Sequence, residues 1–228
     1  MVKDIHFPTS ISGLELDNYL SMGWYRMGQT IFTADIMQFN VSIHTLHWLR
    51  IAINKIYLGR SQQKIVNKNK DLDVRISPFL ITDEIEDLYA LYKDAIDFNV
   101  SPSAASYLLD GAASNMYDTR TIEIRLGCQL IAVGYFDVGN NSIAGILNFY
   151  HPLHKTRSLG KYLMLLKIGY AMQHFKTWYY LGYIANGYPK FDYKLFPDII
   201  ATEVYDSWNN IWRPFSWPLS DGILSGLL

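Results

Sequence analysis

The pattern of hydrophobic and polar residues divides the chain into strand-like and helix-like stretches. Alternation of apolar and polar residues, or a short apolar run, predicts strands over residues 24–32, 43–56, 72–77, 121–125, 129–137, 142–150 and 178–181. Helical spacing of apolar residues and helix-start signals predict helices over residues 14–22, 61–68, 82–97, 103–114 and 158–175. Ser61 is the expected N-cap of the second of these helices, and Thr82 opens the third.

The order of these stretches indicates an α+β fold. Gly127 and the Gly139–Asn140–Asn141 turn separate three consecutive strands, which predicts an antiparallel meander. A helix and a final strand follow, so we expect a mostly antiparallel mixed sheet flanked by helices. The nearest approach to a domain boundary is Pro78. Residues 1–77 are expected to pack on a body formed by residues 78–228, or to form one continuous domain with it.

A basic turn opens the helix predicted over residues 158–175. Arg157, Ser158, Gly160 and Lys161 lie where the turn becomes a helix. Unpaired backbone N–H groups and the helix dipole favour an anion at such a junction, typically a phosphate. Leu159, Leu163, Leu166 and Tyr170 form the predicted buried stripe, and Lys161 and Lys167 are predicted to lie off it.

Composition narrows the classes of function. Half of the 228 residues are hydrophobic, and the net charge of −1 excludes a globally basic nucleic-acid-binding protein. The single cysteine, Cys128, cannot form an internal disulfide or a cysteine-rich metal site and is expected to be buried. The six histidines lack metal-site spacing, so no metal is predicted. Without a signal-like N-terminus or a long apolar run, we expect a cytoplasmic protein that does not contact membranes.

A second basic segment lies upstream. Arg60, Lys64, Lys68 and Lys70 follow one another without an acidic residue until Asp71. Two interpretations stay open: a solvated helix face, or a surface that faces phosphates.

The predicted layout, with a basic turn and a glycine in the first helical turn, is similar to that of the GNAT acyltransferases. Several segments together resemble the aminoacyl-tRNA–protein transferase family, the arginyl- and leucyl-transferases of the N-degron pathway. They are LDNYLSMGWYRMGQTIFTAD, SQQKIVNKNKDLDV, IEIRLGCQLIAVGYFDV, NFYHP with RSLGKY, and YYLGYIANGYPKFDYK. Asp137 belongs to the matching strand pair. The matches stay in order from about Leu16 to Lys194 and so cover most of the chain.

One departure concerns the N-terminal part. The family carries a cysteine cluster after its Gly-x-x-Arg-x-Gly strand, whereas residues 33–48 of this chain contain no cysteine. Either packing by Met37, Phe39, Ile43 and Trp48 substitutes for the cluster, or recognition of the acceptor has changed.

The reaction implied by the resemblance joins an acceptor protein's α-amine to the aminoacyl group of a tRNA ester. The expected partners are therefore aminoacyl-tRNA and proteins that start with Asp or Glu, with no further cofactor. The implied catalytic candidates are Glu123 and Tyr183. The implied binding residues are Arg60, Gln62, Lys64, Arg125, Tyr150, Arg157, Ser158, Gly160, Lys161, Tyr188, Lys190, Tyr193 and Lys194.

These candidates divide by role. The basic turn with Lys190 and Lys194 would hold the negative CCA end of the tRNA, and the tyrosines would stack on ribose and base. Arg125 or Arg60 would meet an acidic acceptor. Glu123 would orient or deprotonate the amine, or would form a structural ion pair with Arg125. Two rivals remain: an acetyl-CoA-dependent N-acetyltransferase using the same turn, and a divergent binding module without catalysis.

Overall fold

The computed structural model describes residues 2–39 and 41–219. In this part of the chain the helices are α1 (Gly13–Ser21), α2 (Arg60–Lys68), α3 (Asp83–Asp94), α4 (Ala104–Leu109) and α5 (Leu159–Gln173). Three 3₁₀ helices are η1 (Ile53–Lys55), η2 (Pro152–Arg157) and η3 (Pro189–Leu195). The strands are β1 (Val2–His6), β2 (Tyr25–Met27), β3 (Thr30–Ala34), β4 (Ile36–Phe39), β5 (Ser42–Ala52), β6 (Asp73–Pro78), β7 (Thr119–Leu126), β8 (Gln129–Val138), β9 (Ser142–Tyr150), β10 (Trp178–Ala185), β11 (Thr202–Asp206) and β12 (Ile211–Pro214).

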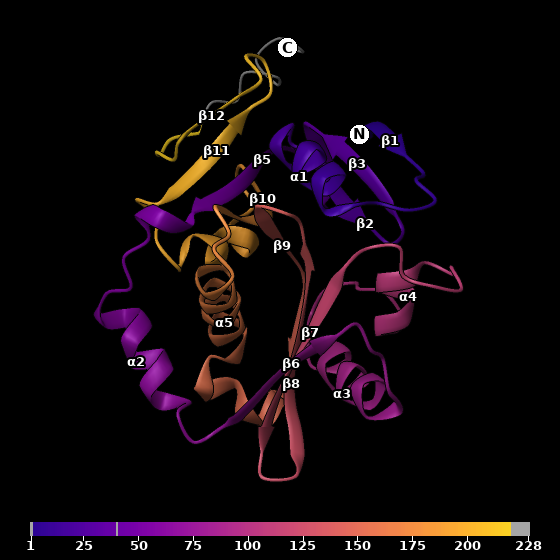
Figure 1. The fold of residues 1–228 in the computed structure, drawn as a ribbon, viewed down its shortest axis with the longest axis vertical. Helices are drawn as coiled ribbons and strands as arrows, with labels where there is room; N and C mark the ends of the chain where they lie inside the picture. The colour runs from indigo at the N-terminus through magenta and orange to yellow at the C-terminus, as the bar shows by residue number, and fades with distance from the viewer. Residues whose placement is uncertain (1, 40, 220–228) are drawn as a thin grey trace.

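One large sheet forms the centre of the molecule (Figure 1). Its strand order is β12-β11-β5-β10-β9-β8-β7-β6, with β4 added on β5. Every pairing is antiparallel except that of β9 with β10, which α5 connects. The predictions of an α+β fold with a mostly antiparallel mixed sheet and of a meander over β7, β8 and β9 are confirmed. Strands β5 and β6, which both begin before residue 78, lie in this same sheet.

Helices cover the two faces of the sheet. Helix α5 packs on one face over Ile131, Phe136 and Ile143, and α3 and α4 pack on the other over Val133, Tyr135 and Phe149. Successive residues of a strand point to opposite faces, which is why each strand of the meander contributes to both cores.

A smaller sheet, β1-β3-β2, packs with α1 beside the large sheet (Figure 1). Ser12 caps α1: its hydroxyl accepts from the Glu15 N–H, and the Glu15 carboxylate accepts from the Ser12 N–H. Strands β2 and β3 form a hairpin, and Leu16 and Leu20 of α1 are buried against Tyr25 and Phe32 of this hairpin. This unit forms a second core against the large sheet.

Several local predictions are corrected. Gly59, not Ser61, is the N-cap of α2. Lys167 is 1% exposed rather than off the buried stripe, because it faces the sheet, where its ammonium donates to the Tyr135 carbonyl and the Asn148 side chain. Cys128 is exposed, since it lies in the turn between β7 and β8 rather than within a strand.

The remaining helices differ in smaller ways. Helix α3 begins at the predicted Thr82 cap but ends at Asp94, and α4 ends at Leu109, where Asp110 adopts left-handed backbone angles. None of the helices in residues 2–39 and 41–219 combines the length and apolarity needed to cross a bilayer.

Candidate functional site

The parallel strands β9 and β10 separate part-way along their length. They pair only where Trp178, Tyr179 and Tyr180 face Ser142, Ile143 and Ala144. The register of β10 with β5 shifts between Tyr180 and Gly182, and Gly182 has a φ of +83°, which favours glycine. The Tyr25 hydroxyl lies 2.5 Å from the Gly145 carbonyl oxygen and 3.1 Å from that of Tyr180. This hydroxyl therefore satisfies backbone groups at the point of separation.

The basic turn lies at the start of α5, after β9. Ser158 adopts left-handed backbone angles (φ 56°, ψ 43°) between η2 and α5. Within the described residues no side chain caps this end of the helix, and the N–H groups of a first helical turn have no acceptor further back within the helix. A Cβ at Gly160 would lie 3.6 Å from the Tyr150 ring. The turn thus offers backbone donors beside an aromatic ring.

Arg157 is held by an acidic partner rather than facing outward. Its guanidinium donates two hydrogen bonds of 2.9 Å to the Asp71 carboxylate and one of 3.1 Å to the Lys68 carbonyl. This ion pair lowers the pKa of Asp71. The buried Asn69 amide donates to the Arg157 carbonyl at 3.0 Å. Together these contacts tie the end of α2 to the turn.

Helix α2 consequently places the second basic segment next to the turn. Arg60 and Lys64 are exposed on it. Gln62 is buried, and its amide donates to the carbonyls of Phe196 (3.0 Å) and Pro197 (2.8 Å) at the end of the η3 segment. The Lys161 ammonium lies 4.5 Å from the centre of the Phe196 ring. The two basic segments and the η3 segment are therefore in contact.

The closing loop, defined here as residues 186–196, carries the tyrosine and lysine candidates. Lys190 forms an ion pair with Asp97 at 3.2 Å and lies 3.6 Å from the centre of the Phe98 ring. Tyr188 stacks on Phe39 with ring centres 4.8 Å apart. Tyr193 is 48% exposed. Of the three candidates Tyr188, Lys190 and Tyr193, the last is the most exposed.

Lys194 reaches from this loop to the point where β9 and β10 separate. Its ammonium donates to the Tyr183 carbonyl at 2.6 Å and lies 4.8 Å and 5.0 Å from the centres of the Tyr183 and Phe191 rings. Burial lowers the pKa of Lys194 to about 7. Burial also raises the pKa of Tyr183 to about 12, so its hydroxyl stays protonated at neutral pH and can donate a proton but not accept one as a base.

Glu123 and Arg125 lie elsewhere. Both are on β7, which is separated from β10 by β8 and β9, a distance of about 14 Å at the usual strand spacing of about 4.8 Å. Arg125 binds the Glu84 carboxylate through both terminal nitrogens and pairs with Glu123 at 3.5 Å. The structure does not bring Glu123 and Tyr183 together, and it places Glu123 in the ion pair.

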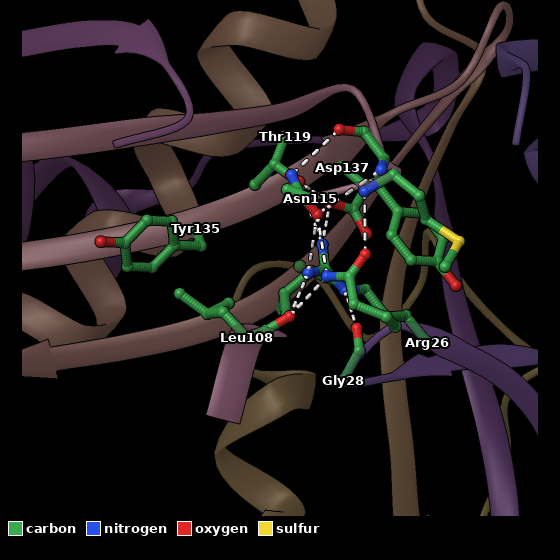
Figure 2. Close-up of polar contacts among 12 residues, drawn as sticks. Arg26, Gly28, Leu108, Asn115, Thr119, Tyr135 and Asp137 are labelled. Atoms are coloured by element: carbon green, nitrogen blue, oxygen red, sulfur yellow. Dashed lines mark hydrogen bonds and ion pairs between the residues drawn. The ribbon is translucent and has the colours of Figure 1, made fainter. Parts of the chain in front are cut away.

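A buried network centred on Arg26 is a feature that the sequence analysis missed (Figure 2). Arg26 pairs with Asp137 at 2.7 Å, and their side chains are 1% and 0% exposed. The other guanidinium hydrogen bonds go to Gly28, Leu108, Asn115 and Thr119. Burial raises the pKa of Asp137 against the opposing effect of Arg26. The signal that could have revealed it is the Gly23-x-x-Arg26-x-Gly28 pattern inside an apolar strand.

Comparisons with known proteins show which family the chain belongs to. The family described as "Arginine-tRNA-protein transferase, C terminus" matches residues 84–196, which run from α3 to the end of the closing loop. The aspartate/glutamate leucyltransferase of Stutzerimonas stutzeri is 30% identical over 175 residues, 76% of this chain and 73% of that protein. The chain belongs to the aminoacyl-tRNA–protein transferase family.

Other relatives and two solved structures extend the comparison. Proteins of the same name from Xanthomonas oryzae and Leptospira interrogans are 31% and 26% identical, over 69% and 82% of this chain and 65% and 74% of their own lengths. A GCN5-related N-acetyltransferase from Kribbella flavida aligns with a TM-score of 0.32 at 16% identity, covering 61% of this chain and 49% of that one. L-PGS from Bacillus licheniformis aligns with a TM-score of 0.40 at 8% identity, covering 61% and 48%. Both scores are too low to carry an argument.

In this family member the cysteine-free segment packs against the closing loop and β10. The Tyr183 hydroxyl contacts the Met37 sulfur at 3.5 Å, Phe39 stacks on Tyr188, and Trp48 meets Tyr183 edge to face. Ile43, which was expected to join this packing, is 55% exposed. The described residues contain no group of three metal-ligating side chains.

Proposed function

We propose that this protein transfers an aminoacyl group from tRNA to the α-amine of proteins that begin with Asp or Glu, with leucine as the first donor to test. Support comes from family membership, and the names of the relatives supply both the donor and the acidic acceptors. The single observation that carries the proposal is the contact between the basic turn, helix α2 and the closing loop beside the separated strands.

The tRNA end would bind at the turn. The α5 first-turn N–H groups, the exposed Lys64 and the half-buried Lys161 offer donors and positive charge to phosphates. Tyr150 beside the turn and Tyr193 on the closing loop offer ring faces for the terminal ribose and base. Since the Arg157 guanidinium already binds Asp71, we assign it a positioning role: it fixes the turn against α2.

The chemistry requires alignment more than a strong base. The free α-amine attacks the ester carbonyl, a C–N bond forms, the C–O bond to the ribose breaks, and the tRNA hydroxyl leaves with a proton. An α-amine has a pKa near ~8, so about a tenth of it is already deprotonated at pH 7. Holding the two reactants together can then supply much of the rate. This scheme forms no covalent intermediate with the protein. Because the proposed donor is aminoacyl-tRNA, we infer that the reaction takes place in the cytoplasm.

Tyr183 is assigned a supporting role in this scheme. Its hydroxyl, held protonated by burial, is a hydrogen-bond donor, and its carbonyl fixes the Lys194 ammonium. Because Glu123 lies three strands from β10 and pairs with Arg125, we assign it to the structure rather than to proton transfer.

A transfer assay tests the proposal. Purified protein is incubated with radiolabelled leucyl-tRNA or arginyl-tRNA and peptides that begin with Asp, Glu or Ala. We expect label on the Asp and Glu peptides and little on the Ala peptide. Calorimetry with acetyl-CoA runs in parallel. Micromolar binding of acetyl-CoA together with no transfer from either tRNA would replace the proposal by an N-acetyltransferase. Absence of both would favour a binding module.

A further inference from the structure

Lys194 occupies an unusual position for a cation. It belongs to the closing loop, yet its ammonium lies against the backbone of β10. A Cβ built on Gly182 would be 3.3 Å from the Lys194 nitrogen, so glycine at this position allows the close approach. The same glycine carries the positive φ where β10 leaves the register of its neighbour. The ammonium is therefore fixed at the point where β9 and β10 separate.

Three of the other basic residues predicted for the site are already paired with carboxylates. Arg157 binds Asp71, Lys190 binds Asp97, and Arg125 binds Glu84 and Glu123. Arg60 and Lys64 are exposed on α2, and Lys161 lies over Phe196 at the turn. Within residues 2–39 and 41–219 no carboxylate lies within ion-pair distance of Lys194.

The surroundings of Lys194 suit an incoming anion. One of its three N–H donors goes to the Tyr183 carbonyl, and the rings of Tyr183 and Phe191 flank the ammonium. Without an acidic partner, burial disfavours the charged form, and the pKa falls. A carboxylate placed beside the ammonium would reverse this effect, because it stabilises the charged form and accepts the remaining donors.

We propose that the Lys194 ammonium binds the side-chain carboxylate of the acceptor's first residue and so selects Asp and Glu over Asn and Gln. The inference rests on the proposed function, because it names the group that recognises the acidic acceptor. Lys194 thus takes the role predicted for Arg60 or Arg125. Arg125, on β7, already binds the Glu84 carboxylate, and Arg60 lies at the exposed start of α2. Selection follows because a neutral amide in the same place would leave the cation without a counter-charge.

A second role for Lys194 has to be separated from this one. Its hydrogen bond to Tyr183 also fastens the closing loop to β10, and losing that bond would slow transfer to any acceptor. The two roles differ in what they predict for matched acceptors. Loss of fastening reduces transfer to Glu and Gln peptides alike, whereas loss of recognition reduces transfer only to the acidic one.

The experiment compares kcat/KM for peptides that differ only in a first residue of Glu or Gln, and of Asp or Asn. Lys194→Met, which keeps the length of the side chain without its charge, is expected to lower the Glu/Gln and Asp/Asn ratios by roughly 10- to 100-fold. Lys194→Arg keeps the charge and is expected to retain most of the preference. Lys190→Met is the matched control on the same loop and is expected to leave both ratios unchanged.

The outcomes are distinguishable. Wild-type protein that transfers no aminoacyl group overturns the proposed function and this inference with it. Transfer by the wild type with unchanged ratios in Lys194→Met overturns the inference alone. If Lys194→Met does not fold, the test uses NMR of the wild-type protein. An Asp-starting peptide should shift the Lys194 Cε resonance, and an Asn-starting peptide should not. Equal shifts with both peptides would count against the inference.

Discussion

Arg26→Met tests whether the buried network around Arg26 holds the β2–β3 hairpin to the large sheet. The side chains of Arg26 and Asp137 are almost completely buried and lie 2.7 Å apart. Removing one partner of such a pair leaves an uncompensated buried charge, which costs about 3–5 kcal/mol. At about 2–4 °C per kcal/mol for a chain of this length, the melting temperature should fall by roughly 6–20 °C.

The same substitution should make stability depend on pH. Burial already raises the pKa of Asp137, and without Arg26 the folded-state pKa rises further above the unfolded value near ~3.9. The folded variant then binds more protons than the unfolded chain, so its free energy of unfolding falls as pH rises, by at most about 1.4 kcal/mol per pH unit. The deficit relative to wild type should therefore be smaller at pH 5 than at pH 8.

Urea unfolding at several pH values measures both effects. Arg26→Met combined with Asp137→Asn removes the stranded charge, so the double variant should lose the added pH dependence and should be more stable than the single variant at pH 8. Arg213→Met is the matched control, because Arg213 pairs with Asp206 at 2.9 Å while 53% exposed, a geometry worth at most about 1 kcal/mol. The reasoning fails if Arg26→Met costs no more than Arg213→Met, or if its cost is the same at every pH.

Three further predictions concern the site. Gly182→Ala places a Cβ next to Lys194 on a residue with left-handed backbone angles, so it should lower the melting temperature, measured by calorimetry, and transfer to Glu peptides. Unchanged transfer would contradict the close approach of Lys194 to Gly182. Asp71→Asn frees Arg157, so the KM for aminoacyl-tRNA should rise in steady-state kinetics while the melting temperature changes little; an unchanged KM would show that the turn does not need this pair. Lys64→Met should reduce the slope of log affinity against log salt by about 0.7–0.9 in tRNA binding; the full slope in the variant would place the phosphates elsewhere.

Local patterns were sufficient for much of the fold. The meander followed from turn residues between strand-like runs, because a hairpin depends on neighbours in sequence. The basic turn was placed at a helix start for the same reason: residues 157–161 carry the whole signal. Helix ends were less accurate: α3 stops at Asp94, and α4 stops at Leu109, where Asp110 and Gly111 both have positive φ.

The partners of the charged side chains could not be predicted from local patterns. Arg157 meets Asp71 across 86 residues of sequence, and Lys167 lies in the core because its ammonium finds the Tyr135 carbonyl and the Asn148 side chain. Both facts depend on how α2, α5 and the sheet pack together. Helical spacing places Lys167 one turn after Leu163, and both side chains lie over Gly134 of β8, so its charge and not its position argued for the surface. Which cations are paired and which remain available was therefore visible only in the structure.

The cysteine-free hairpin formed by β4 and β5 supports the closing loop through side-chain packing. Its strands β4 and β5 contact the loop through the stack of Phe39 on Tyr188 and through a 2.8 Å contact between His44 Nδ1 and the Asn186 carbonyl oxygen. The same hairpin meets Tyr183, whose carbonyl holds Lys194. The hairpin and the ammonium are thus linked through Tyr183 and through the closing loop itself. Because ring stacking and apolar contacts depend on shape, a smaller side chain at Phe39 should loosen the loop and with it the position of Lys194.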